Sequence, residues 1–542
     1  MKLKRNSIPL RKTSAGDQIE TRPLYVEEWL DSLPYIDFQK TSQLLYEASK
    51  ATNQQDLKPS VRVELATLYN RPYQYYLDSQ IKTGAQHTLQ SIETMQSQIN
   101  ILKHIAVNLS YACKLVVQET LIHKTMWRHS KPPLPAMLMS LNYLSHALIF
   151  SFLEYAPVPK NVWTELNFIY DFAEGMGQEN ASIVPAGGDP KKDTTTIEEA
   201  YKRIAMASLV DPHHLPFGAI WEIFEQLKSW SEYTQIKVFG KPDNPDGYFV
   251  IDLESDTRPT AYIDFKATSA NKKHRLIDAG ALDSLIKKHL DLLESGQRLD
   301  DSVQLSAYFA KSILSQMSRT WSLPPKRYSP RQTQTGVLNL ACGLNSIYFY
   351  LNDEQEFISP DMPDSDDMTD EFEYRLGQSD ITVTADYETE QWQLVNQGPG
   401  GFAVTRHGKP RNMIRVGDLV GISHAANGSA PSSSWAIGVI RWLMIKKKNI
   451  YKIGIQTIAV DIFAATVRAT SGRPQESQFR RAFIAGETMD SGVNSIITSK
   501  GLFKNARELE INYQNEIFRV YADSLTESSI SFEHFVVKQH AV

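Results

Sequence analysis

Cysteine, net charge and uninterrupted apolar runs are all scarce in this sequence of 542 residues. Two cysteines, Cys113 and Cys342, are too few for a disulfide framework or a site of four thiolates, and they fit a reducing compartment. The formal net charge is -5, so the chain has no general positive field that would attract polymeric nucleic acid or an anionic membrane. Any anionic ligand must therefore meet a local cluster of positive charge.

No stretch has the continuous apolar character of a membrane span. The most apolar stretch, residues 136–153, is interrupted by polar side chains, namely Ser140, Asn142, Ser145, His146 and Ser151. We therefore expect a buried core helix there and no membrane insertion. Residues 1–20 carry Lys and Arg, but no apolar segment follows them, so we expect a flexible basic tail, no secretory signal and a cytoplasmic location.

The length exceeds what one hydrophobic core needs, and it predicts an α+β protein with several domains. Residues 21–320 are expected to form a mainly helical domain. Apolar residues recur there three and four positions apart, from Ile101 through Leu109 to Val116, which puts them on one helix face. A non-repetitive all-α bundle is the default, and a helix-pair repeat array stays open. Alternation near residues 248–266 predicts a β-hairpin within this domain.

Beyond the helix break at Leu323, Pro324 and Pro325, short β-branched segments predominate. Their close spacing predicts a small β-barrel over residues 321–470 and a further β segment, residues 471–542, that packs on it. The expected strands are residues 337–344, 392–395, 402–405, 435–443, 451–458, 466–468, 508–513 and 517–521.

A strongly acidic segment lies between the first two expected strands. Residues 353–373 contain ten carboxylates and no Lys or Arg. Such a block repels itself, and its spacing lacks the central glycine of a calcium-binding loop. We therefore expect a solvated, disordered insertion.

Two short segments on either side of this insertion carry the functional argument. Arg327 and Arg331 form an Arg-x-x-x-Arg pattern ahead of the first strand. Asn396, Gly398 and Gly401 belong to a glycine-rich turn between two later strands. Together these segments resemble the signature of the PilZ domain, a family of cyclic di-GMP receptors.

The resemblance spans the expected barrel and implies that this barrel binds cyclic di-GMP. The family pattern is Arg-x-x-x-Arg followed by Asp/Asn-x-Ser-x-x-Gly. It carries the ligand contacts onto Arg327, Arg331, Asn396 and Gly401, and onto Gly398, which stands where the family usually has Ser. No further cofactor is expected.

The residue types suit such a ligand. A guanidinium is planar and permanently charged, so it can bind phosphate, stack on a purine and match guanine O6 and N7. Asn396 would contribute its side-chain amide, and the neighbouring glycines would let the ligand approach backbone N–H groups. Trp321 and Tyr328 could stack on a base, or could equally well fill an interface between the barrel and the helical region.

Three classes of function can be compared with the sequence: a receptor, a scaffold and an enzyme. The preferred one is a receptor that passes cyclic di-GMP binding to an unidentified protein partner through the helical region, in motility, pilus or biofilm control. The alternative is a nucleotide-independent scaffold that keeps the barrel shape. An enzyme is least favoured, because the sequence has no Ser-His-Asp elbow, P-loop, Rossmann fingerprint or zinc signature, so no catalytic residue or metal ligand is assigned. The acidic pair Asp252 and Asp256 is the weak exception.

Overall fold

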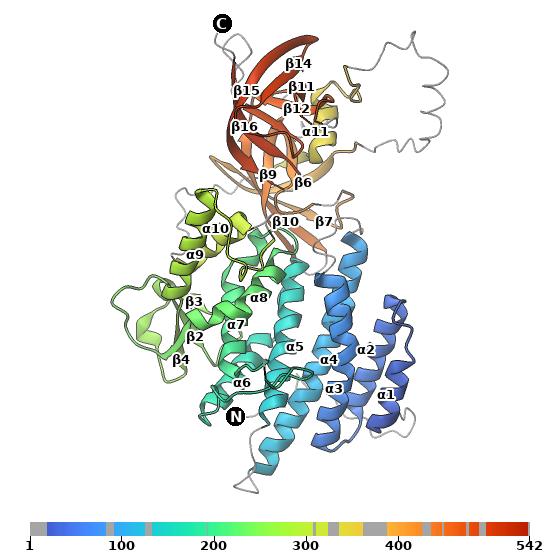
Figure 1. Ribbon diagram of the computed structural model, residues 1–542, viewed down its shortest axis with the longest axis vertical. Helices are drawn as coiled ribbons and strands as arrows, with labels where there is room; N and C mark the ends of the chain where they lie inside the picture. Colours follow the sequence, from blue (N-terminus) through green and yellow to red (C-terminus); the bar gives the residue numbers. More distant parts are fainter. Residues whose placement is uncertain are drawn as a thin grey trace. The chain divides into compact units, whose positions relative to one another are not determined.

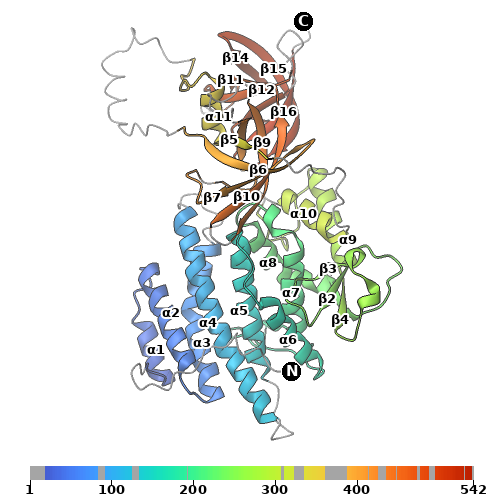
Figure 2. The same cartoon turned by 180° about the vertical axis from the view of Figure 1, so that it is seen from behind.

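The computed structural model divides the chain into two compact units, Met1–Lys326 and Arg327–Val542. Helices and a small sheet make up the first unit, and two β-barrels make up the second (Figures 1 and 2). The structure describes residues 19–82, 92–124, 133–191, 193–306, 310–322, 335–360, 387–412, 414–424, 435–446, 449–472, 476–486, 495–529 and 531–539.

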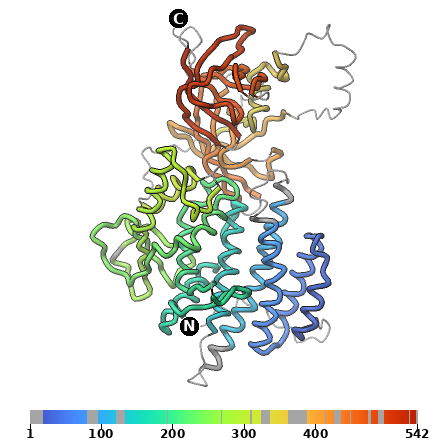
Figure 3. Tube along the Cα trace, in the orientation of Figure 1, coloured from blue at the N-terminus to red at the C-terminus, as the bar shows by residue number. Residues whose placement is uncertain are grey.

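The first unit is a helical bundle in which α4 packs against α2, α3 and α5, and α5 also packs against α6, α7 and α8 (Figure 3). The apolar stripe expected along α4 is confirmed, because Leu102, Ile105 and Leu109 are at most 1% exposed. The helices are α1 (Pro23–Asp31), α2 (Phe38–Gln54), α3 (Pro59–Tyr76), α4 (Ile92–Lys124), α5 (Leu134–Leu153), α6 (Val162–Glu174), α7 (Ile197–Leu209), α8 (Ala219–Trp230), α9 (Gly280–Glu294) and α10 (Ala310–Ser322).

The helix α5 is the core helix that the sequence predicted. Among the described residues it is the one helix long and apolar enough to cross a membrane, and 94% of its apolar window is buried inside the protein. Two of its polar side chains are satisfied within the helix, since the hydroxyls of Ser145 and Ser151 donate to the carbonyls of Leu141 and Ala147. These serines therefore do not need water.

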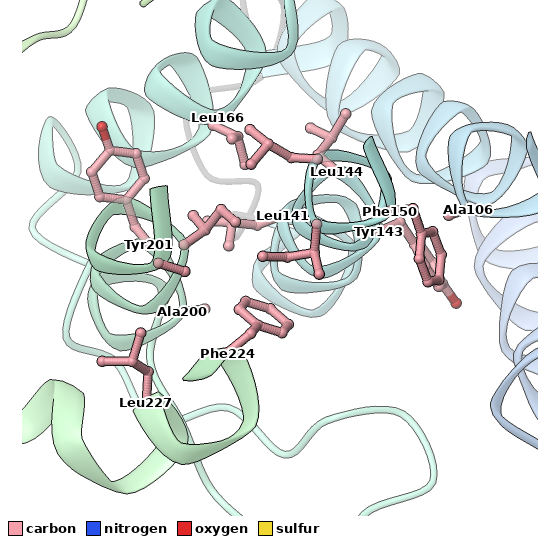
Figure 4. Packing of buried hydrophobic residues seen from close by; sticks show 14 of the residues in the cluster. Ala106, Leu141, Tyr143, Leu144, Phe150, Leu166, Ala200, Tyr201, Phe224 and Leu227 are labelled. Carbon is pink, nitrogen blue, oxygen red and sulfur yellow. The ribbon is translucent and has the colours of Figure 1, made fainter. Parts of the chain in front are cut away.

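The core of the first unit is continuous across the helices that surround α5. Figure 4 shows Leu141 and Leu144 of α5 in one cluster with Leu166 of α6, Tyr201 of α7 and Phe224 of α8. All five side chains are buried. Burial of this kind contributes roughly 1.5–3 kcal/mol per large apolar side chain, so the cluster is a main source of the unit's stability.

A four-stranded antiparallel sheet completes the first unit, in the order β1-β4-β2-β3. The expected hairpin is confirmed as the β2–β3 pair, whereas β1 and β4 were not predicted from the sequence. The strands are β1 (Gln235–Val238), β2 (Tyr248–Asp252), β3 (Thr260–Ala261) and β4 (His274–Asp278). The loop between β2 and β3 has a structural role, because Asp256 accepts the backbone N–H groups of Asn161, Trp163 and Thr164 at the start of α6.

The second unit holds two closed six-stranded barrels. The first has the order β10-β7-β6-β5-β8-β9, and the second has the order β11-β12-β13-β16-β15-β14. The first consists of β5 (Val337–Cys342), β6 (Glu390–Gly398), β7 (Gly401–His407), β8 (Leu419–His424), β9 (Ala436–Lys446) and β10 (Ile450–Ala459). The second consists of β11 (Ile462–Ala469), β12 (Arg480–Ala485), β13 (Ser495–Thr498), β14 (Glu508–Tyr513), β15 (Glu516–Ser528) and β16 (Glu533–Gln539).

Every strand expected from the sequence overlaps an observed strand, with two differences in detail. The end of the first expected strand is helical, because α11 (Gly343–Leu351) begins where Gly343 adopts a φ of 83°. The segment expected to pack on the first barrel is a closed barrel of its own. Its first strand, β11, lies within the range expected for the first barrel but pairs with β12 and β14.

The two barrels share a buried junction built around α11. Ile347 of α11 lies in one apolar cluster with Leu419 of the first barrel and with Phe483 and Phe532 of the second. At the edge of the junction, the guanidinium of Arg441 on β9 forms a two-armed ion pair with Glu527 on β15. Bidentate pairs of this kind fix orientation as well as supplying energy.

Candidate functional site

The glycine-rich segment forms the turn of the β6–β7 hairpin, as the sequence predicted. Gly398 pairs with Gly401, and Pro399 and Gly400 are the two residues between the strands. Two-residue connections are the commonest way to join antiparallel strands, and they favour glycine. The turn therefore places Asn396, two residues before Gly398, near the end of β6.

A β-bulge at Val395 determines the face on which Asn396 lies. Leu394 pairs with Val404, and the next pair is Asn396 with Ala403, so Val395 is the extra residue. Leu394 and Val404 are buried side chains of the barrel interior. Because successive residues alternate between faces and paired residues share a face, Asn396 and Ala403 lie on the outer face. The pair that closes the turn lies on the same face.

Two glycines of the turn face different surroundings. A Cβ atom on Gly401 would lie 2.0 Å from the carbonyl oxygen of Ile455 on β10, so only glycine fits this close approach. The N–H of Thr457 also donates to the carbonyl of Gly400 at 3.1 Å. A Cβ atom on Gly398, by contrast, would meet no atom within 4 Å. The fold therefore requires glycine at 401 and leaves room for a side chain at 398.

Arg327, Tyr328 and Arg331 lie outside the residues that the structure describes. The carbonyl of Gly336 accepts the N–H of Leu394 at 2.8 Å, two residues before Asn396. Arg331 precedes Gly336 by five residues, which can span at most about 18 Å. Gly336, five residues after Arg331 in the chain, therefore lies beside the strand that carries Asn396.

The described residues on either side of the acidic insertion lie at the end of the β5–β6 pair opposite the glycine turn. Val337 at the start of β5 pairs with Gln393, whereas Leu340 pairs with Glu390 at the start of β6. The insertion follows α11 and leads into β6. Its described part includes Phe357, which packs on a tyrosine of α11. Residues 361–373, expected to be disordered, lie outside the described residues.

Trp321 lies in the last turn of α10 and belongs to the core of the first unit. Its side chain is 0% exposed. A fully buried ring offers no face to a base, so the structure does not support the stacking interpretation of Trp321. Proximity to the arginines in sequence was the only argument for that interpretation.

A cavity of about 330 Å³ lies elsewhere on the second unit and was not predicted from the sequence. It is lined by Cys342, Gly343, Asn412, Arg415, Asp418, Leu419 and Ser531. The Asp418 carboxylate accepts the backbone N–H of Arg415 at 2.8 Å. Burial raises the pKa of Asp418 to about 6, although Arg415 opposes the shift.

Replacing Asp418 with Asn should make the protein more stable at neutral pH. The folded-state pKa lies above the unfolded value, so the folded protein holds an extra proton between about pH 4 and pH 6 and loses stability as the pH rises through this range. A shift of about two units corresponds to roughly 3 kcal/mol at pH 7. Asp418→Asn should recover up to that amount and flatten the pH dependence of the free energy of unfolding. Urea titrations at pH 4.5 and pH 7 measure both effects, and parallel profiles for the two proteins would contradict the burial argument.

Three family models match most of the chain between residues 25 and 539. The model described as "Cyclic-di-GMP receptor FimW, N-terminal domain" matches residues 25–243. The model described as "Cyclic-di-GMP receptor FimW, middle PilZ domain" matches residues 248–378 and 362–462. The model described as "FimW C-terminal beta-barrel domain" matches residues 465–539.

A curated relative agrees with these matches. The protein named "Cyclic-di-GMP receptor FimW" from Pseudomonas aeruginosa strain PAO1 is 22% identical over 562 aligned residues, which cover 95% of this chain and 90% of the relative. No solved structure matches the chain. The PilZ match begins within the first unit and ends with the first barrel, and the C-terminal match covers the second barrel. The chain therefore belongs to the PilZ-domain family, as a member with a helical N-terminal region and a second, C-terminal barrel.

Proposed function

We propose that this protein is a cyclic di-GMP receptor that binds the dinucleotide on the outer face of its first barrel. The observation that carries the proposal is the register of the β6–β7 hairpin, which places Asn396, Gly398 and Gly401 on one outer face. The chain that follows Arg327 and Arg331 joins the barrel beside that hairpin. The name of the relative supports the same ligand.

Each group in this site has a distinct task. The guanidinium groups of Arg327 and Arg331 bind the phosphates and match the Hoogsteen edges of the guanines. The side-chain amide of Asn396 orients the ligand through hydrogen bonds. Gly398 and Gly401 have no side chains to obstruct the outer face, so the ligand can approach the backbone N–H groups of the turn.

Ligand binding to the barrel affects the helical unit through the segment that connects the two units. The division of the chain falls between Lys326 and Arg327, so the arginine segment directly follows the helical unit. Binding that orders this segment changes the freedom of the connection, which is a known type of switch. We infer that the helical unit then contacts a protein partner in motility, pilus or biofilm control. The two cysteines in 542 residues support a cytoplasmic location.

Titration calorimetry on the full chain tests the proposal. Cyclic di-GMP should bind with measurable heat, and cyclic di-AMP should bind much more weakly, because adenine presents a donor where guanine O6 is an acceptor. Absence of binding by both dinucleotides would favour the alternative, a scaffold that keeps the barrel without its ligand. Glycine at position 398, where the family usually has serine, is the specific observation in favour of that alternative.

Restoring the family's serine should tighten binding. The space beyond Gly398 is open, so the side chain of Gly398→Ser fits without moving its neighbours. A hydroxyl that donates to a charged phosphate adds about 1.5–3 kcal/mol, which corresponds to an affinity gain of roughly tenfold or more. Calorimetry with Gly398→Ser and Gly398→Ala separates the hydroxyl from the added methylene. Equal affinities for the two variants would show that the hydroxyl at position 398 does not contact the ligand.

A further inference from the structure

The glycine turn lies beside β10, because β10 pairs with the whole of β7. Gly398 pairs with Gly401, and Gly401 pairs with Gln456 on β10. Paired residues share a face of the sheet, so Gln456 lies next to the turn on the outer face of the barrel. The backbone N–H of Thr457 also donates to the carbonyl of Gly400 at 3.1 Å. The position of β10 therefore helps to determine the position of the turn.

A hydrogen bond from β9 orients the side chain of Gln456. The Nε atom of Arg441 donates to the Oε1 atom of Gln456 at 2.7 Å. A guanidinium has no acceptor, so the carboxamide must direct its oxygen toward Arg441 and its NH2 group away from it. Gln456 is exposed, and an exposed glutamine without such a partner would sample several rotamers. Arg441 thus gives the surface beside the turn one arrangement.

The second barrel fixes Arg441 in its turn. Arg441 is the extra residue of a β-bulge between Ile440 and Trp442 on β9. Its Nη1 and Nη2 atoms donate to the two carboxylate oxygens of Glu527 on β15, the latter at 2.8 Å. The two side chains of this ion pair are 34% and 23% exposed. A bidentate pair sets the plane of the guanidinium, and with it the direction of the Nε–H bond to β10.

We infer that Arg441 and Glu527 are positioning residues of the dinucleotide site, which hold Gln456 and β10 in place beside the glycine turn. The inference rests on the proposed function and makes the second barrel a part of the binding machinery. Both residues act through Gln456 and β10 rather than through contact with the ligand. Coupling between two sites is reciprocal, so a dinucleotide bound at the turn also strengthens the junction between the barrels.

Removal of the Glu527 carboxylate separates positioning from long-range electrostatics, because the two effects have opposite signs. The dinucleotide is an anion, so the loss of a nearby carboxylate would tighten binding if charge alone mattered. Positioning predicts that Glu527→Ala binds more weakly by roughly 2- to 30-fold, the range for loss of a coupling contact between sites. Glu527→Gln keeps an acceptor for Arg441 and should retain more of the affinity than Glu527→Ala.

A double substitution shows whether Glu527 acts through Gln456. Gln456→Ala alone should weaken binding, and the addition of Glu527→Ala to this variant should cause no further loss of affinity. Glu510→Ala is the matched control, because it removes a carboxylate that pairs within the second barrel, with Arg468 at 2.8 Å and with Arg519 at 3.2 Å. It should leave the affinity unchanged even where it lowers the melting temperature.

Calorimetry with cyclic di-GMP on the full-length proteins, with thermal unfolding of each variant, decides between the outcomes. The inference predicts weaker binding by Glu527→Ala, equal affinities for Gln456→Ala and the double variant, and natural affinity for Glu510→Ala. It is overturned if Glu527→Ala binds equally well or more tightly, if the two losses of affinity are additive, or if affinity follows melting temperature across the variants. An absence of binding by the natural protein would overturn the proposed function and this inference together.

Discussion

Replacing Arg327 and Arg331 together with alanine should weaken cyclic di-GMP binding by more than a hundredfold. Hydrogen bonds to charged groups contribute about 1.5–3 kcal/mol each, and the double substitution removes at least two of them. The protein carries a formal net charge of -5, so it has no general positive field that would attract the anionic ligand in place of the arginines. The loss of affinity is therefore larger. Titration calorimetry on the full chain should record little or no heat for this variant.

Lysine substitutions and a distant arginine provide the controls for this experiment. Arg327→Lys with Arg331→Lys keeps both charges but loses the planar fork, so its affinity should fall between those of the natural protein and the alanine variant. Arg519→Ala removes a 65% exposed arginine of the second barrel and should leave binding unchanged. Unaltered affinity in the double alanine variant would show that the ligand, if bound, is held elsewhere.

Replacing Glu165 with alanine should cost the helical unit about 3–5 kcal/mol of stability. Glu165 on α6 accepts from Lys114 on α4 at 2.7 Å, and the two side chains are only 9% and 3% exposed. Burial already lowers the pKa of Lys114, and Glu165 opposes that shift. Removing the carboxylate leaves an ammonium group inside the protein without its main compensating charge.

Two further variants show whether this loss of stability comes from the buried charge of Lys114 in the absence of Glu165. Lys114→Met with Glu165→Leu replaces both charges by apolar side chains and should recover most of the stability. Glu27→Ala breaks a pair with Arg71 whose side chains are 47% and 55% exposed, so it should cost less than about 1 kcal/mol. Urea unfolding followed by far-ultraviolet circular dichroism compares the proteins. A Glu165→Ala variant as stable as Glu27→Ala would contradict the argument.

Local patterns predicted eight of the twelve barrel strands and missed β8, β12, β13 and β16, and the pairing between strands could not be predicted locally. Residues 508–513 alternate clearly and form β14, yet the closure of the second barrel needs β14 to pair with β11 far back in the chain. Whether α11 is helix or strand depends on its surroundings, because its apolar run suits both. The short β1 is mostly exposed and has no clear alternation to detect.

The candidate site was predictable only where it is continuous in sequence. The turn at Asn396 to Gly401 is a local motif, and the structure confirms it as the β6–β7 turn. The face on which Asn396 lies could not be predicted, because it depends on a bulge that shifts the strand by one residue. Trp321 shows the converse, since it is close to the arginines in sequence and is buried in the first unit.

Hydrogen–deuterium exchange on the full chain, with and without cyclic di-GMP, tests the central claim most directly. Simultaneous protection of residues 325–334 and 396–401 is the predicted result, with no change in β13 of the second barrel. Such a result would show that the arginine segment and the glycine turn hold one ligand together. Protection confined to other segments, or a saturating ligand that leaves the arginine segment unprotected, would contradict the account.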